Sequence, residues 1–115
     1  MRNCLKVHYA DFRNNSLQVI ETGTFKRCTN LLDLVLDENR ISQVQPGGFV
    51  GLRNINNLNM TICDLKVLRP HTFGGMLRLN KLYLDQCHLE EIPSGLFLDP
   101  TTDGVPDKGI TPFRL

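Results

Sequence analysis

The sequence predicts a repeat solenoid of the α/β type, built from short parallel strands that stack into one sheet. Apolar residues recur every 24 positions along most of the 115-residue chain. Each unit has a phenylalanine at the same place, and near its start polar and apolar residues alternate as in a half-buried strand. Because fixed internal periods are the signature of stacked repeat architectures, this period decides the fold class.

Seven apolar columns define the repeat when Leu31 is position 1 and the chain is stepped by 24 residues. They hold an apolar residue at 27 of 28 places, whereas a composition of 41% hydrophobic residues would fill fewer than half. The columns are Val7, Leu31, Ile55 and Leu79 at position 1; Ala10, Leu34, Leu58 and Leu82 at position 4; Phe12, Leu36, Met60 and Leu84 at position 6; Leu17, Ile41, Leu65 and Leu89 at position 11; Ile20, Val44, Leu68 and Ile92 at position 14; Phe25, Phe49, Phe73 and Phe97 at position 19; and Cys28, Leu52, Met76 and Pro100 at position 22.

The alternation at positions 4 and 6 predicts strands centred near residues 9–11, 33–35, 57–59 and 81–83. Equivalent strands of neighbouring repeats should pair in parallel, about 4.8 Å apart. Position 9 lies where the chain leaves the strand, and an inward asparagine there can bond backbone groups outside the ladder. This column holds Asn15, Asn39, Cys63 and Cys87.

These columns spell L-x-x-L-x-L-x-x-N/C-x-L, and over residues 7–100 the chain resembles the leucine-rich repeat family. The resemblance implies a horseshoe segment, with a short parallel β-sheet on the concave side and turns or short 3-10 segments on the convex side. Phenylalanine at position 19 and the pair Ile92-Pro93 resemble the "typical" 24-residue subclass of animal extracellular proteins, such as Toll-like receptors, Slit proteins and small proteoglycans. That subclass implies protein recognition at the cell surface or outside the cell.

The repeats divide the chain into consecutive units of one domain. We expect residues 1–6 to end a preceding partial repeat, followed by repeats at 7–30, 31–54, 55–78 and 79–99. Residues 100–115 carry three of the six prolines, and we expect a mobile tail there. No cysteine-rich end cap is recognisable, so we expect a piece of a longer array whose open sheet edges invite self-association.

The outward positions 3, 5, 7 and 8 of the strands form the candidate binding face. Across the four repeats these positions carry five acids and two bases, which suits a protein ligand with a basic patch. The alternative is a solvated sheet face that needs charge only for solubility. The predicted binding residues are Tyr9, Asp11, Asp33, Val35, Asp37, Asn57, Thr61, Lys81, Tyr83 and Asp85, with Tyr9, Val35, Ile62 and Tyr83 as exposed anchors.

The four cysteines fall into two sets that share a repeat position. Cys4 and Cys28 lie at position 22, and Cys63 and Cys87 lie at position 9. Stacked residues have Cα atoms within disulfide range, but parallel side chains would leave Cβ atoms roughly 5 Å apart, so we predict buried free thiols. Two sequons, at Asn14 and Asn59, are candidate glycosylation sites in the secretory pathway.

Several functional classes find no support in the sequence. A net charge of +1 argues against nucleic acid, and no apolar run is long enough to cross a bilayer or serve as a signal peptide. No nucleophile has a base placed by the repeat, and we predict no enzyme, metal site or cofactor. An extracellular or cell-surface recognition segment is therefore expected, with an intracellular scaffold or a structural spacer as alternatives. The histidines, at different repeat positions, are His8, His71 and His88.

Overall fold

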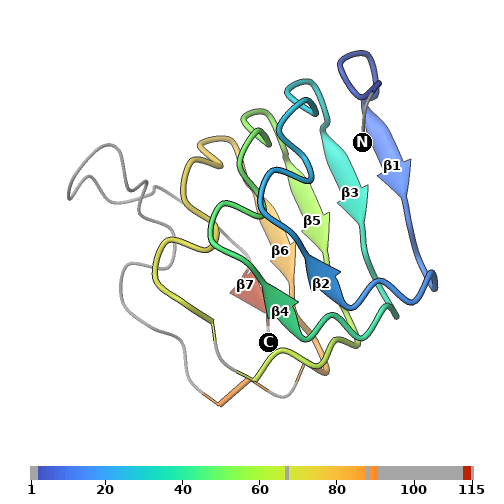
Figure 1. Ribbon diagram of the computed structural model, residues 1–115, viewed down its shortest axis with the longest axis vertical. Coiled ribbons are helices and arrows are strands. Elements are labelled where there is room, and N and C mark those ends of the chain that lie inside the picture. The colour runs from blue at the N-terminus through green and yellow to red at the C-terminus, as the bar shows by residue number, and fades with distance from the viewer. Residues whose placement is uncertain (1–2, 67, 88, 91–112, 115) are drawn as a thin grey trace.

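The computed structural model describes residues 3–66, 68–87, 89–90 and 113–114. Its main sheet has five parallel strands in the order β1-β3-β5-β6-β7 (Figure 1). Position 3 of each of the four repeats lies beside position 3 of the next, so the pairing follows the 24-residue period. The four expected strands are confirmed. The strands are β1 (Tyr9–Asp11), β3 (Asp33–Val35), β5 (Asn57–Asn59), β6 (Lys81–Tyr83) and β7 (Phe113–Arg114).

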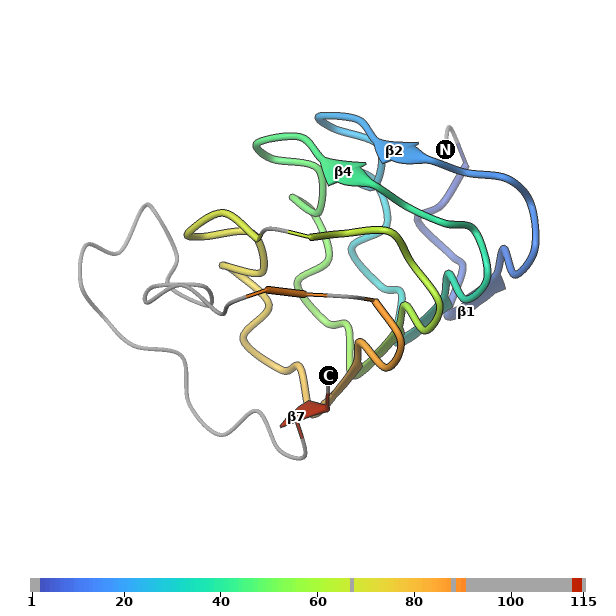
Figure 2. The same ribbon diagram turned by 90° about the horizontal axis from the view of Figure 1, so that it is seen from below.

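A second, two-stranded parallel sheet lies on the opposite side of the coil (Figure 2). Its strands are β2 (Val19–Ile20) and β4 (Gln43–Val44), and turns connect them to the main sheet. The described residues contain no helix, and the returning chain is made of turns and these short strands. The horseshoe curvature implied by the resemblance remains a prediction.

The apolar columns form one core between the two sides of the coil. Leu34, Leu58 and Leu82 of position 4 are fully buried. In the second and third repeats the residues of the other apolar columns are also buried, apart from Val44, which is partly buried. In the first repeat Val7, Phe12 and Leu17 are only partly buried. Each repeat thus buries its apolar face against its neighbours, as the columns predict.

The phenylalanines of position 19 form a stack through the core. The ring centroids of Phe25 and Phe49 are 6.1 Å apart, and those of Phe49 and Phe73 are 5.6 Å apart, with the rings close to parallel. All three side chains are at most 3% exposed, which confirms their predicted stacking. Phe97 lies outside the described residues.

Asn39 at position 9 satisfies backbone groups of two repeats at once. Its Oδ1 accepts hydrogen bonds from the backbone N–H groups of Asn15 (2.7 Å) and Leu17 (3.1 Å). Its Nδ2 donates to the carbonyl oxygens of Phe12 (2.8 Å) and Leu36 (3.1 Å). The predicted role is confirmed for Asn39, which is 2% exposed. Asn15 is exposed, and its side chain donates to Arg13 O within its own turn.

The prediction of free thiols is wrong. Disulfides join Cys4 to Cys28 and Cys63 to Cys87, and the chain has no free cysteine. The paired Cα atoms are 4.7 and 4.5 Å apart. Free thiols would require the Cα–Cβ bonds of stacked cysteines to run parallel, as in a strand. All four cysteines lie outside the strands, where no pleat imposes that direction.

The 24-residue period does not predict a strand after the fourth repeat. In the structure, Phe113–Arg114 pair in parallel with Leu82 and Tyr83 as β7. Residues 100–112 and 115, most of the expected mobile tail, lie outside the described residues. Counted from Leu82, Phe113 comes 31 residues later and not 24, so a search at a fixed period cannot find this strand.

Left-handed backbone recurs at four positions of the repeat, 8, 10, 17 and 21, and positions 8 and 17 show it in three or more repeats. At position 8 the φ angles of Asn14, Glu38, Ile62 and Gln86 all lie within 59–61°. At position 17 they lie at 68–78° in Gly23, Gly47 and His71. The turns therefore impose this conformation whatever residue occupies it, and a β-branched side chain such as that of Ile62 is the least suited to it.

Replacing Ile62 with asparagine should stabilise the fold. Asparagine tolerates the left-handed region, and Asn14 already occupies this position in the first repeat. We expect the free energy of unfolding to rise by about 1 kcal/mol in urea denaturation, because a strained residue of this kind costs about 1 to 3 kcal/mol. Val50→Asn is the control, since Val50 is exposed but has no positive φ. A loss of stability in Ile62→Asn with none in the control would contradict the assigned strain.

Removing the second disulfide should destabilise the third and fourth repeats. Because the bond closes a loop of 24 residues, Cys63→Ala with Cys87→Ala should lower the free energy of unfolding by about 3 kcal/mol. Cys63→Asn with Cys87→Asn should lose less, because asparagine at position 9 can make the bonds that Asn39 makes. In the native sequence, denaturant without reductant should expose no thiol to a thiol reagent; finding four would restore the free-thiol prediction.

Candidate functional site

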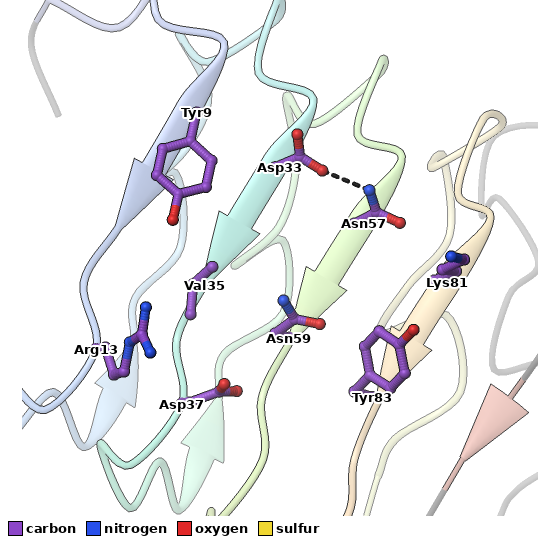
Figure 3. Close-up of a pocket in the computed structure, with 9 residues that line it drawn as sticks. All are labelled: Tyr9, Arg13, Asp33, Val35, Asp37, Asn57, Asn59, Lys81 and Tyr83. Atoms are coloured by element: carbon purple, nitrogen blue, oxygen red, sulfur yellow. Dashed lines mark hydrogen bonds between the residues drawn. The ribbon is translucent and has the colours of Figure 1, made fainter.

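A shallow pocket of about 430 Å³ opens on the outward face of the main sheet (Figure 3). Seven of the ten predicted binding residues line it, and Asp11, Thr61 and Asp85 do not. Arg13 and Asn59 also line it, although neither was among the predicted binding residues; their outward positions 7 and 5 were the available signal. The lining residues are Tyr9, Arg13, Asp33, Val35, Asp37, Asn57, Asn59, Lys81 and Tyr83.

The strands place these residues in a regular array. Position 3 contributes a side chain from each of β1, β3, β5 and β6, and the pairing sets them in one row across the sheet. Val35 lies on β3 between Asp11 of β1 and Asn59 of β5. Its predicted exposure is wrong: it is 7% exposed, because the neighbouring strands flank it on both sides. Val35 is therefore part of the pocket floor and not a projecting anchor.

Both pocket carboxylates are held by residues of the next repeat. Asp33 Oδ1 accepts a hydrogen bond of 2.5 Å from Asn57 Nδ2. Asp37 Oδ1 accepts two, from the backbone N–H of Thr61 at 2.7 Å and from its hydroxyl at 2.9 Å. In the part of the chain that the structure describes, no hydrogen bond reaches Oδ2 of either aspartate. Each carboxylate is thus oriented and keeps one acceptor oxygen for a ligand.

An ion pair occupies the β1 side of the face. Arg13 Nη2 lies 2.7 Å from Asp11 Oδ2, and the Tyr9 hydroxyl donates to the same oxygen at 3.4 Å. The hydrogen bonds from Arg13 lower the pKa of Asp11, and those to Asp11 raise the pKa of Arg13. Since both groups are exposed to solvent, the pair orients Arg13 more than it stabilises the fold.

One buried polar atom of the pocket has no partner. Asn57 donates through Nδ2 to Asp33, which turns Oδ1 toward the β6 side of the pocket (Figure 3). Among the described residues, no donor reaches this oxygen. A buried acceptor without a hydrogen bond is costly, so a donor supplied by a ligand would be favoured there.

The other candidate residues are dispersed. Asn14 is exposed in the turn after β1, and Asn59 lies partly buried in the pocket. His8 and His71 are exposed, and His88 lies outside the described residues. Within the described ranges, no group of three or more His, Cys, Asp or Glu side chains is arranged to hold a metal ion.

The pocket is lined mostly by charged and polar groups. Two carboxylates and two cations line it, beside two amides and two phenols, and the lining set contains no serine, cysteine or histidine. No described helix is long and apolar enough to cross a membrane.

Comparison with known proteins identifies the repeats. The leucine-rich repeat family model matches residues 11–65, which include β3, β4 and β5. No curated protein matches the chain. Leucine-rich repeats are generally protein–protein interaction modules and are typically non-catalytic. The disulfides are consistent with an extracellular location. Residues 11–65 of this chain are therefore a leucine-rich-repeat region.

Proposed function

We propose that this chain is a recognition segment of an extracellular or cell-surface leucine-rich-repeat protein, and that it binds a protein ligand through the outward face of the main sheet. The observation that carries the proposal is the acidic end of that face, where Asp37, Glu38 and Asp85 lie in the turns after β3 and β6, close to Tyr83 at the end of β6. Side chains at these positions are not needed for the core, so they are available to a partner.

The disulfides support the extracellular setting over the intracellular scaffold. Structural disulfides persist in oxidising compartments and are rare in the cytosol. Cys63–Cys87 joins two repeats whose strands lie within the proposed binding face. The "typical" animal subclass, shared by Toll-like receptors, Slit proteins and small proteoglycans, fits this setting and is part of the proposal.

The negative charge of the face is concentrated at one end of the strands. Asp37, Glu38 and Asp85 lie in the turns that follow β3 and β6, and we call these three residues the acidic rim. The turns are joined across repeats, since Glu38 N–H donates to Thr61 O and Ile62 N–H donates to Asp85 O. A basic patch on a protein ligand would meet this rim, with Tyr83 beside it as an anchor.

Charge reversal at the rim should weaken binding in a salt-dependent way. Glu38 is the residue to change: it is exposed and no described hydrogen bond uses its side chain, whereas Asp37→Lys would also break the bonds to Thr61. Protein ligands would first be found by testing secreted proteins of the source organism for binding. Glu38→Lys should then slow association more at low salt than at physiological salt, because the electrostatic screening length falls from roughly 30 Å at 0.01 M to about 8 Å at physiological ionic strength. Tyr83→Ala should speed dissociation at both salt concentrations, measured by surface plasmon resonance.

The matched control lies on the other side of the coil. Lys66→Glu with Arg69→Glu changes two exposed charges near the second sheet and should leave both rates unchanged. If this pair abolishes binding while the rim and Tyr83 variants bind normally, the ligand uses the opposite surface and the proposed face is wrong.

Passage through the secretory pathway should leave a glycan on Asn14. This asparagine is exposed in a turn, whereas Asn59 lies partly buried in the pocket. Expressed in a eukaryotic host behind a secretion signal, the chain should show a mass increase that a glycosidase removes and that Asn14→Gln abolishes. Asn59→Gln should leave the mass increase intact. A secreted chain unmodified at Asn14 would remove the glycoprotein part of the proposal.

A further inference from the structure

We propose that the pocket on the main sheet binds an uncharged oligosaccharide. The lining is the first reason. Ordinary small-ligand pockets have volumes of about 300 to 1,000 Å³ and are lined predominantly by apolar side chains. This pocket has a comparable volume of about 430 Å³, yet Val35 is its only aliphatic residue and is itself 7% exposed. A pocket of this size with a polar lining suits a small hydrophilic ligand.

The balance of charges selects an uncharged ligand. Two carboxylates, Asp33 and Asp37, and two cations, Arg13 and Lys81, line the pocket, so a ligand meets charges of both signs. Arg13 is also paired with Asp11 outside the lining. A lysine or arginine side chain entering the pocket would meet two cations, and an anion would meet two carboxylates. Sugar hydroxyl groups both donate and accept, so they can bond carboxylates, ammonium, guanidinium and amides together without carrying a charge.

The polar groups are also held in place before a ligand arrives. Asn57 and Thr61 fix the two carboxylates and leave their Oδ2 atoms without a hydrogen bond among the described residues. Asn57 Oδ1 is buried and lacks a donor, which a hydroxyl would supply. Groups oriented in this way bind a weakly attracted ligand at a smaller entropic cost.

Aromatic rings stand on both sides of this polar floor. Tyr9 rises from β1 and Tyr83 from β6, with Asp33, Asn57 and Asn59 between them (Figure 3). Three strand spacings separate β1 from β6, or about 14 Å at 4.8 Å each. The C–H faces of sugar rings are apolar and pack on tyrosine rings, so a chain of sugars lying across the strands would meet a ring at each end.

The inference goes beyond the proposed protein ligand and does not depend on it. The acidic rim lies at the strand ends, and two of its three residues, Glu38 and Asp85, lie outside the pocket. A protein could dock on the rim while a glycan, free or carried by that protein, occupies the pocket. The two activities are tested with different probes.

Tyrosine signals report on this pocket alone. The chain has two tyrosines and no tryptophan, and both tyrosines line the pocket. We would titrate the disulfide-bonded chain with neutral oligosaccharides (cellotriose, maltotriose, mannotriose and tri-N-acetylchitotriose), and follow the tyrosine ring resonances by NMR and the tyrosine fluorescence. At least one oligosaccharide should shift both sets of ring resonances saturably, whereas a tri-lysine peptide and inorganic phosphate should not.

Variants locate the binding. Asp33→Asn removes a charged acceptor at constant shape and should weaken saccharide binding at least about tenfold. Lys81 is exposed and its side chain has no described hydrogen bond, so Lys81→Met should weaken saccharide binding about threefold or more without altering the fold. Asp64→Asn is the matched control outside the pocket and should bind as the native chain does. Unfolding curves of all three variants separate loss of binding from loss of fold.

The outcomes separate this inference from the proposed function. The pocket assignment is overturned if none of the four saccharides causes a saturable shift. It is also overturned if the shift is the same in the folded Lys81→Met and Asp33→Asn variants as in the native chain. Preferential binding of tri-lysine would assign the pocket to a basic peptide instead, and a glycan attached to Asn59 would fill it and also overturn the inference. Saccharide binding without a protein ligand would support the inference while the proposed function fails, and protein binding alone would do the reverse.

Discussion

Each repeat buries its apolar face only against the repeat beside it, and this stacking constrains the rest of the structure. The strongest links in the chain therefore run between residues 24 positions apart. They include the contacts of Phe49 with Phe25 and Phe73, the reach of Asn39 into the preceding turn, and both disulfides. A change in any of these columns alters the packing of two repeats at once, whereas a change at an outward position alters the surface and, at Asp33 or Asp37, a hydrogen bond to the next repeat.

Position 9 shows two solutions to one problem. Where the chain leaves the strand, the turn has backbone groups that the ladder does not bond, and Asn39 bonds several of them while remaining buried. In the next two repeats the same column holds Cys63 and Cys87, whose disulfide leaves no S–H to donate and joins the two repeats covalently. The first solution is independent of redox conditions and the second is not. The end of the sheet that carries Tyr83 thus depends on an oxidising environment.

The period made the inward half of the structure predictable from the sequence. Strand positions, core columns and the phenylalanine stack follow from residues that must be apolar, because stacking leaves them no other place. The thiol prediction failed because it applied strand geometry to cysteines that lie in turns. The exposure of Val35 was misjudged because the pattern gives the direction of a side chain and not the size of its neighbours.

The site was less predictable, because outward positions obey no column rule. The sequence gives the charges of the face but not their pairing, and the structure shows that pairing decides their use. Arg13 forms an ion pair with Asp11, and one carboxyl oxygen of Asp37 already accepts a hydrogen bond from Thr61. The face therefore separates into a pocket lined by charges of both signs and an acidic rim that includes Glu38. One scaffold can then present two adjacent surfaces of different chemistry, because the apolar core that stacks the repeats lies on the other face of the sheet.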